Sequence, residues 1–435
     1  MAKNKISILG AGLSTMSIAY HLESDDYAIY EKDSVVGGHC RTKEREGFFF
    51  DYGGHIFYPK TDYVKQLVTD LLGENCRESA REAWIYSYDT YTRYPFQANL
   101  FGLPTDVVKD CLAGLHDAQV KQAEDNSDEP PTDFLDFIYK TFGEGIAKHF
   151  MIPFNTKHWR VPLDQITLDW MGKFLPRPSF EKTLEGSLSQ SEACIGQNSI
   201  FMYPKRGGIQ MVCDKFEEKI NPINFNSEVT EIDVENKTFT INGSEVISYE
   251  TLVSTLPLPV VIECLKDVPQ EVEDAVAKLR WNNLYVVSVT VDKPVLTEKH
   301  RLYVSSTDYI FHKLAFFSSY APEMSPTGKS AVSAEVVYSK EAPVDRSTVE
   351  ARVVADLKKM NIISEDDKIL FTDVIDMPYA YAIFDSNKSE AVATIRDYLA
   401  SKNVLCEGRY GEWAYQNMEQ NIARGKEVAE RVGSI

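Results

Sequence analysis

The sequence lacks the features that mark several classes of protein. Its seven cysteines form no CxxC pair, so we expect neither a zinc site nor a disulfide framework. No apolar run approaches the roughly 18 residues that a transmembrane helix needs. The first apolar strand begins within a few residues of Met1, which leaves no room for a signal peptide, and we expect a cytoplasmic protein.

Positive charge is also scarce. Lysine and arginine number 46 against 65 aspartates and glutamates, which gives a formal net charge of −19. Such a surface repels phosphate backbones and anionic lipid, so neither nucleic acid nor a membrane surface is an expected partner. With 435 residues, 43% of them hydrophobic, the chain is long enough for two or three domains with a large core.

The most informative stretch that is present lies at the start of the chain. An apolar run at 5–9 enters Gly10 and Gly12 and then a helical stretch, which is typical of a Rossmann unit: the first glycine permits the turn and the second lets backbone approach a pyrophosphate. Thr15 stands where the pattern usually has its third glycine, so strand and helix are expected slightly further apart. Glu31 ends the second strand, where its carboxylate can accept hydrogen bonds from ribose hydroxyls.

A second glycine pair follows at Gly37 and Gly38, with Arg41 close behind. The pair predicts a second close approach of backbone to the dinucleotide, and the arginine supplies a cation for its diphosphate. Nicotinamide enzymes rarely add this second pair, whereas FAD enzymes of the amine-oxidase and mutase type do. We therefore predict FAD.

The remaining pattern predicts an α/β protein. Helical spacing covers 62–72, Asn242-Gly243 is a strong hairpin signal, β-rich runs occur at 284–291, 331–338 and 370–375, and a final helix begins near Met418. We predict a Rossmann-like FAD-binding domain with an inserted helical domain and an antiparallel β-sheet substrate domain. The predicted ranges are 1–95, 205–265 and 400–435 for the FAD-binding domain, 96–200 for the helical insert, and 266–399 for the substrate domain.

At Gly53-Gly54-His55, Tyr94-Pro95-Phe96-Gln97 and 408–415 the sequence resembles UDP-galactopyranose mutase, nearer its eukaryotic-type branch. The resemblance runs through nearly the whole chain, and the fragments occur in the right order. It implies FAD that an external reductant must reduce, and a redox-neutral interconversion of pyranose and furanose forms of a nucleotide-diphosphate sugar, of the UDP-galactopyranose and UDP-galactofuranose type. In that reaction flavin N5 attacks the anomeric carbon, uridine diphosphate leaves, and the adduct opens to an iminium and recloses through another hydroxyl.

The glycine pattern and the resemblance together assign the candidate site residues. The resemblance implies catalytic roles for His55 and Arg409. The predicted cofactor-binding residues are Gly10, Gly12, Leu13, Ser14, Thr15, Glu31, Lys32, Gly38, His39, Arg41, Gly54, His55, Ile56, Val229, Arg409, Asn417 and Met418. The predicted substrate-binding residues are Tyr94, Phe96, Gln97, Asn155, Trp159, Asn198, Tyr303, Lys313, Tyr379 and Tyr415.

Two positions depart from the family pattern. The family pairs two arginines with the substrate diphosphate, but Phe174 stands at the first position and Lys313 at the second. Lysine keeps the charge and loses the bidentate fork of arginine. Lys173 and Arg177 are candidate substitutes, and the departure bears on the identity of the sugar nucleotide more than on the reaction type.

Two other functions compete with a mutase. An amine-oxidase-like flavoenzyme or desaturase predicts an aromatic cage and turnover with oxygen, and a non-catalytic flavin-binding module predicts no organised second site. The tyrosines and the asparagine and glutamine side chains named above favour the mutase. No motif specifies the sugar, the physiological reductant or the oligomeric state.

Overall fold

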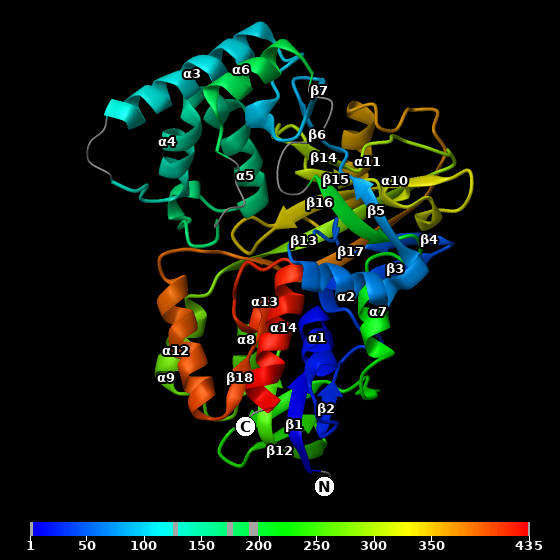
Figure 1. The fold of residues 1–435 in the computed structure, drawn as a ribbon, viewed down its shortest axis with the longest axis vertical. Helices are drawn as coiled ribbons and strands as arrows, with labels where there is room; N and C mark the ends of the chain where they lie inside the picture. The colour runs from blue at the N-terminus through cyan, green and yellow to red at the C-terminus, as the bar shows by residue number, and fades with distance from the viewer. Residues whose placement is uncertain (1–2, 125–128, 172–176, 191–198, 434–435) are drawn as a thin grey trace.

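Two seven-stranded sheets dominate the protein. The structure is a computed structural model that describes residues 3–124, 129–171, 177–190 and 199–433 (Figure 1). A lobe of helices stands at one end of the molecule, beside the second sheet, and both chain termini lie at the opposite end, with the first sheet (Figure 1). These observations confirm the predicted α/β fold.

The first sheet has a parallel centre in which β1 lies between β12 and β2. Ile8 of β1 packs into the core on one face and Leu9 into the core on the other. Both faces are therefore covered, as expected for parallel strands that read as continuous apolar runs. The strands are β10 (Val229–Asp233), β11 (Thr238–Ile241), β12 (Glu245–Ser254), β1 (Lys3–Leu9), β2 (Tyr27–Tyr30) and β9 (Ile223–Asn224), with β18 (Val404–Cys406) beside β12.

Helices cover the two faces of this sheet. One face carries α1 (Leu13–His21), α2 (Asp62–Leu72), α7 (Met211–Glu217) and α14 (Met418–Gly433), and the other carries α8 (Leu258–Cys264), α9 (Gln270–Ala277) and α12 (Lys388–Ser401). The last helix therefore returns to the first, and the α1–α14 contact closes this part of the protein. The predicted hairpin is confirmed, because β11 turns into β12 through Asn242 and Gly243, both with positive φ.

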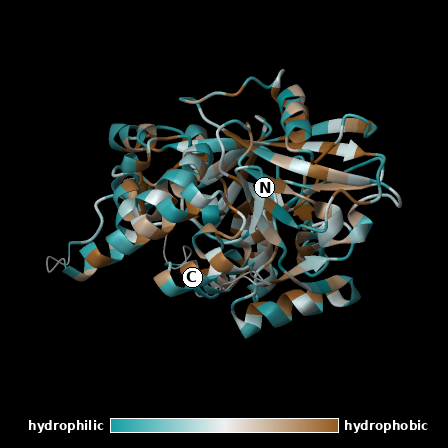
Figure 2. Cartoon of the chain, turned by 90° about the horizontal axis from the view of Figure 1, so that it is seen from above, coloured by the Kyte–Doolittle hydropathy of each residue, from teal (hydrophilic) through white to brown (hydrophobic). Residues whose placement is uncertain are grey.

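The second sheet is antiparallel except where β14 runs parallel to β6. Val332 and Val336 of β16 face α11 (Val349–Lys359), whereas Ala331 and Val337 face the opposite way. The helices on the outside of the protein carry both hydrophilic and hydrophobic residues, as Figure 2 shows. The strands in order are β17 (Ile369–Ala382), β13 (Trp281–Val291), β16 (Ser330–Tyr338), β15 (Lys313–Ala315), β14 (Arg301–Val304), β6 (Ala83–Ser87) and β7 (Thr90–Arg93).

The helical lobe has its own apolar core, to which Phe134, Phe142 and Trp159 contribute. Its helices are α3 (Thr105–Glu124), α4 (Phe134–Ile146), α5 (Ile152–Trp159) and α6 (Phe180–Leu188), and smaller elements elsewhere are β5 (Cys76–Ala80) paired with β8 (Ile200–Pro204), α10 (Phe317–Tyr320) and α13 (Gly408–Gly411). In the described part of the chain, no helix combines the length and the apolar character that a bilayer span requires.

The predicted FAD-binding range reaches residue 95, yet β6 and β7 lie in the second sheet. The reason is that Ala83 to Tyr86 pair in parallel with Arg301 to Val304, a contact between distant parts of the chain. The division into three domains stays a prediction.

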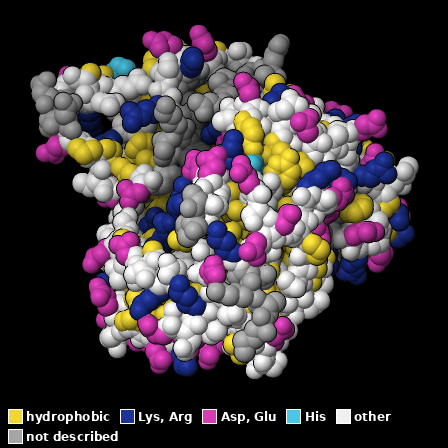
Figure 3. Space-filling view, turned by 60° about the horizontal axis from the view of Figure 1, so that its bottom comes forward, with side chains coloured by type: hydrophobic (Ala, Val, Ile, Leu, Met, Phe, Trp, Pro, Cys, Tyr) yellow, Lys and Arg dark blue, Asp and Glu magenta, His cyan; other side chains and the backbone are white. Residues whose placement is uncertain are grey.

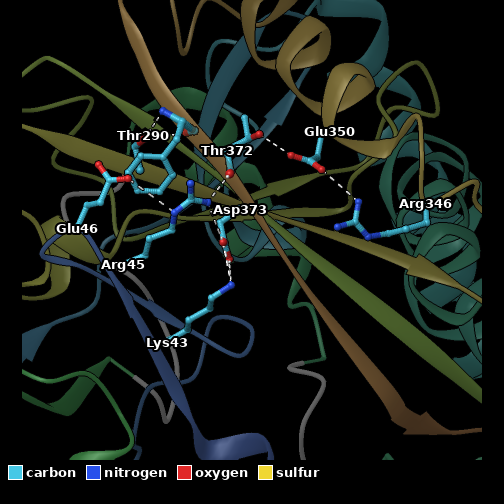
Figure 4. Close-up of polar contacts among 9 residues, drawn as sticks. Lys43, Arg45, Glu46, Thr290, Arg346, Glu350, Thr372 and Asp373 are labelled. Atoms are coloured by element: carbon cyan, nitrogen blue, oxygen red, sulfur yellow. Dashed lines mark hydrogen bonds and ion pairs between the residues drawn. The ribbon is translucent and has the colours of Figure 1, made fainter.

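A hairpin of β3 (Thr42–Arg45) and β4 (Phe48–Asp51) connects the first sheet's glycine turns to the second sheet. Its anchor is Asp373 of β17, whose carboxylate accepts from Lys43 Nζ at 2.8 Å and from Arg45 at 3.2 Å (Figure 4). The Arg45 guanidinium also lies 4.2 Å from the centre of the Phe371 ring. Asp373 therefore holds the hairpin by charged hydrogen bonds to two cations.

We predict that Asp373→Asn destabilises the protein by about 1–3 kcal/mol, because it removes the negative charge of a buried carboxylate that pairs with Lys43 and Arg45. Urea denaturation of the FAD-loaded protein measures the change. The matched control is Glu218→Gln, which breaks an exposed pair with Lys215 and should cost about 0.5 kcal/mol or less. Equal losses in the two variants would contradict the anchoring role.

Candidate functional site

The first glycine turn has space for a ligand. β1 ends at Leu9, Gly10 donates its N–H to the carbonyl of Tyr30 at 2.8 Å, and α1 begins directly after Gly12. A Cβ at Gly12 would meet no described atom within 4 Å. No described side chain caps the N-terminus of α1. Its first N–H groups are therefore available for a phosphate.

The second glycine pair lies against the first turn. Gly37 donates its N–H to the carbonyl of Ala11 at 2.9 Å and forms a parallel bridge with Gly12. A Cβ at Gly38 would be 3.4 Å from the Cα of Gly12. Arg41 is bound to Asp33 at 2.8 Å. The structure thus brings both predicted glycine turns together at the start of α1.

Glu31 follows β2 and contacts the first glycine turn. Its Oε2 accepts from the N–H of Ala11 at 2.7 Å, and its Oε1 accepts from the N–H of Asp33 at 2.9 Å. Lys32 is exposed, and Val229 is half-buried at the start of β10. Thr15 is buried, and its hydroxyl lies 2.9 Å from that of Thr255, so a polar contact stands where the common pattern has glycine.

The C-terminal segment completes this side of the site. Ser14 Oγ donates to Asn421 Oδ1 at 2.6 Å, and the same oxygen accepts from the N–H of Arg409 at 3.2 Å. Asn417 caps α14 by accepting from the N–H of Gln420 at 2.9 Å, and its neighbour Met418 is buried. The predicted cofactor residues at 409, 417 and 418 therefore lie near the start of α1.

The Gly53-Gly54-His55 turn lies between the two sheets. Gly54 donates its N–H to Glu335 Oε1 at 2.9 Å, and its carbonyl accepts a hydrogen bond from Arg301. The Nδ1 atom of His55 is buried and has no hydrogen-bond partner among the described residues. Burial lowers the pKa of His55 to about 4; Glu335 opposes the shift, and Arg409 and Arg301 reinforce it. The imidazole is neutral at pH 7.

Those features fit FAD. The N–H groups at α1 suit a pyrophosphate, Glu31 lies at the strand end that contacts an adenosine ribose, and the unpaired Nδ1 of His55 offers a polar contact on the far side. Ile56 beside it is buried.

His39 Nδ1 lies 2.6 Å from the Tyr410 hydroxyl. Burial is the main cause that lowers the pKa of His39 to about 3, and the nearby His55 and Arg409 add to it.

A second cluster combines cations with tyrosines. Arg81 donates to the Tyr303 hydroxyl at 2.8 Å and lies 4.6 Å from the centre of the Tyr94 ring, which stacks on Tyr303. Burial raises the pKa of Tyr303, but Arg81, Arg301 and Lys313 outweigh burial and lower it to about 8.

Lys313 continues the cluster. Its Nζ lies 3.1 Å from Glu335 Oε2 and 3.5 Å from the Tyr381 hydroxyl. The Arg409 guanidinium is 5.8 Å from the centre of the Tyr381 ring and 5.0 Å from that of Tyr415. Tyr381 is therefore the side chain that links Lys313 to Arg409.

Other predicted substrate residues lie further into the lobe. Phe96, Gln97 and Trp159 are buried, and Asn155 is buried with its amide donating to the carbonyl of Met151 at 2.7 Å. Tyr379 lies elsewhere: it stacks on Trp281, with ring centres 5.0 Å apart, and both rings pack against the core of the first sheet. No contact described in this structure joins Tyr379 to Lys313.

Three of the residues named from the sequence lie outside the described residues: Asn198, Lys173 and Phe174. Arg177, the other candidate substitute for a family arginine, is exposed.

Sequence reasoning missed Arg81, Arg301, Glu335 and Tyr381. One signal was available, because residues two apart in a strand share a face, and Arg301 is two residues before the predicted Tyr303. Glu335 was detectable as the one charge within the apolar stretch 331–337.

Comparison with known proteins supports this description. The family model described as flavin containing amine oxidoreductase matches residues 11–432. A crystal structure of reduced UDP-galactopyranose mutase is similar at a TM-score of 0.91 and 26% identity, covering 99% of this chain and 95% of the other. The fold is also similar to a CLA-producing fatty acid isomerase from P. acnes (TM-score 0.67, 14% identity, 98% of each chain) and to putrescine oxidase bound to putrescine (TM-score 0.65, 15% identity, 100% of each chain).

Family membership implies a bound flavin, and the features of the glycine turns fit FAD. Because the match extends over nearly the whole sequence, the chain belongs to the flavin containing amine oxidoreductase family.

Proposed function

We propose that this protein is a reduced-FAD-dependent isomerase that interconverts pyranose and furanose forms of a nucleotide-diphosphate sugar, of the UDP-galactopyranose and UDP-galactofuranose type. The similarity to a reduced UDP-galactopyranose mutase over 99% of the chain supports the proposal. The eukaryotic-type assignment and the need for an external reductant are parts of the same proposal.

The observation that carries the proposal is a local surplus of positive charge. Arg81, Arg301, Lys313 and Arg409 are all buried or half-buried, and Glu335 is the one carboxylate among the described residues that pairs with any of them. The neighbouring histidines do not change the balance, because burial lowers the pKa of each, and they are neutral at pH 7.

Four cations and one anion leave the cluster with a positive net charge, although the whole chain has a formal net charge of −19. The Nε groups of Arg81 and Arg301 are also buried without a hydrogen-bond partner in the described part of the structure. Unpaired charge and unpaired donors are costly to bury, and an anionic ligand compensates both. Figure 3 shows Lys and Arg side chains inside the recess below the helical lobe.

A diphosphate fits this cluster and a protonated amine does not. Phosphate oxygens accept from guanidinium and ammonium groups, whereas a substrate cation would be repelled by the same side chains. The amine-oxidase alternative, which the fold shared with putrescine oxidase keeps open, requires the opposite charge balance.

Each group then has a role in the reaction. When bound at the glycine turns, reduced FAD would supply the nucleophile for the anomeric carbon. Arg81 and Lys313 neutralise the leaving diphosphate, and Tyr303 and Tyr94 form a stacked aromatic wall against the nucleotide. His55, neutral and held beside Gly54, orients the flavin, and Arg409 adds positive charge on the same side.

The first test of the proposed function is turnover. Anaerobic holoenzyme reduced with dithionite should convert UDP-galactofuranose for many turnovers per flavin, since the reaction has no net redox change, while oxidised enzyme should be inactive. Cyanoborohydride added during turnover should yield a flavin with an added hexose mass. Bleaching by amines with recovery in oxygen, and no trapped flavin, would establish the amine-oxidase alternative instead.

A second test uses pH. Because the pKa of Tyr303 is lowered to about 8, the phenol is neutral below that pH and becomes an anion above it. The new negative charge should repel a diphosphate, so UDP affinity should fall as pH rises through about 8. Spectral titration of the holoenzyme with UDP measures this dependence.

Tyr303→Phe should remove most of that fall, because phenylalanine cannot ionise. Tyr338→Phe is the matched control, since the Tyr338 hydroxyl donates to Asp376 at an exposed position and should leave the profile unchanged. An identical pH profile in Tyr303→Phe and wild type would show that Tyr303 does not control diphosphate affinity.

A further inference from the structure

Glu335 occupies an unusual position. It lies in the middle of β16, directly opposite Lys313 of β15, and its side chain is on the same face as Ala331 and Val337. Only 4% of the residue is exposed. An ionised carboxylate among such small and apolar side chains is stable only if it is fully paired.

Each carboxylate oxygen has its own hydrogen-bond partner, one from the turn that contains Gly54 and one from β15. Oε1 accepts from the N–H of Gly54 at 2.9 Å, and Oε2 accepts from Nζ of Lys313 at 3.1 Å. His312 Nε2 lies 3.7 Å from Oε2. Burial raises the pKa of Glu335, but Lys313 and Arg301, with the Gly54 N–H, outweigh burial and lower it to about 2. The carboxylate is therefore charged at pH 7.

The two oxygens serve different sides of the site. The Oε1 contact fixes the Gly53–Gly54 peptide, one residue before His55, and a Cβ on Gly54 would come within 3.1 Å of that oxygen. The Oε2 contact fixes Lys313, which we place on the diphosphate side. Thus one side chain touches both the turn that contains His55 and the cation Lys313.

We propose that Glu335 is a positioning residue that couples the two sides: it holds the Gly54-His55 turn against the flavin and partly neutralises Lys313, so its charge sets both the flavin potential and the diphosphate affinity. The diphosphate part of this inference rests on the proposed function. The flavin part rests only on the FAD fit of the glycine turns.

Two variants separate the two contacts. Glu335→Gln keeps an oxygen that accepts from Gly54 and loses the charge, whereas Glu335→Ala loses both. Asp373→Asn is the matched control, because Asp373 is another buried, doubly paired carboxylate of the same sheet that contacts β3 and not Gly54. All proteins are studied as holoenzymes.

In Glu335→Gln the midpoint potential of FAD should rise, because removal of a negative charge stabilises the anionic reduced flavin. UDP should also bind more tightly, of order tenfold. This is the effect expected for one unit charge about 10 Å away at an effective dielectric near 20. A variant that only loosened the fold would bind UDP more weakly. Glu335→Ala should raise the potential too, and should in addition change the visible circular dichroism of bound FAD.

Asp373→Asn should leave the UDP affinity within twofold of wild type and the flavin midpoint potential within experimental error of it. A potential and a UDP affinity in Glu335→Gln that match those of Asp373→Asn would overturn the proposal and leave Glu335 a structural ion pair. Failure of the wild-type protein to bind UDP would instead refute the proposed function, and the flavin potential of Glu335→Gln would still decide whether Glu335 acts on the cofactor side.

Discussion

The cost of burying like charges is the constraint on which the site depends. Arg81, Arg301 and Lys313 converge on Tyr303 and Glu335, and one carboxylate cannot neutralise three cations. The protein tolerates this arrangement because tyrosine rings and backbone carbonyls surround the charges, and because a bound dianion would complete the pairing. Local positive charge in a chain with a formal net charge of −19 is thus a specific feature of the proposed ligand site.

The fold delivers these groups from distant parts of the chain. The glycine turns and α1 supply the dinucleotide side, and β14, β15 and β16 supply the charged side. The β3–β4 hairpin, anchored on Asp373, packs on the same face of β16 that carries Glu335. The hairpin therefore connects the glycine turns with the sheet that carries Glu335.

Local patterns predicted much of this structure. The helix Asp62–Leu72, the hairpin at Asn242-Gly243 and the antiparallel β13, β16 and β17 follow from periodicity and turn chemistry. The Glu335–Lys313 pair does not, because it depends on the register between β15 and β16, which single-sequence patterns leave undefined. The sequence pattern also does not predict the role of Tyr381. In a regular strand Tyr379 and Tyr381 would share a face, but the positive φ of Tyr379 breaks that alternation.

Binding of oppositely charged ligands tests the central claim most directly. Calorimetric titration of the FAD-loaded protein with UDP and with putrescine, under one buffer and salt condition, compares a diphosphate with a diamine at the same cluster. The account predicts saturable binding of UDP, lost when Arg81 is replaced by methionine, and no binding of putrescine. Saturable binding of putrescine with none of UDP would contradict it.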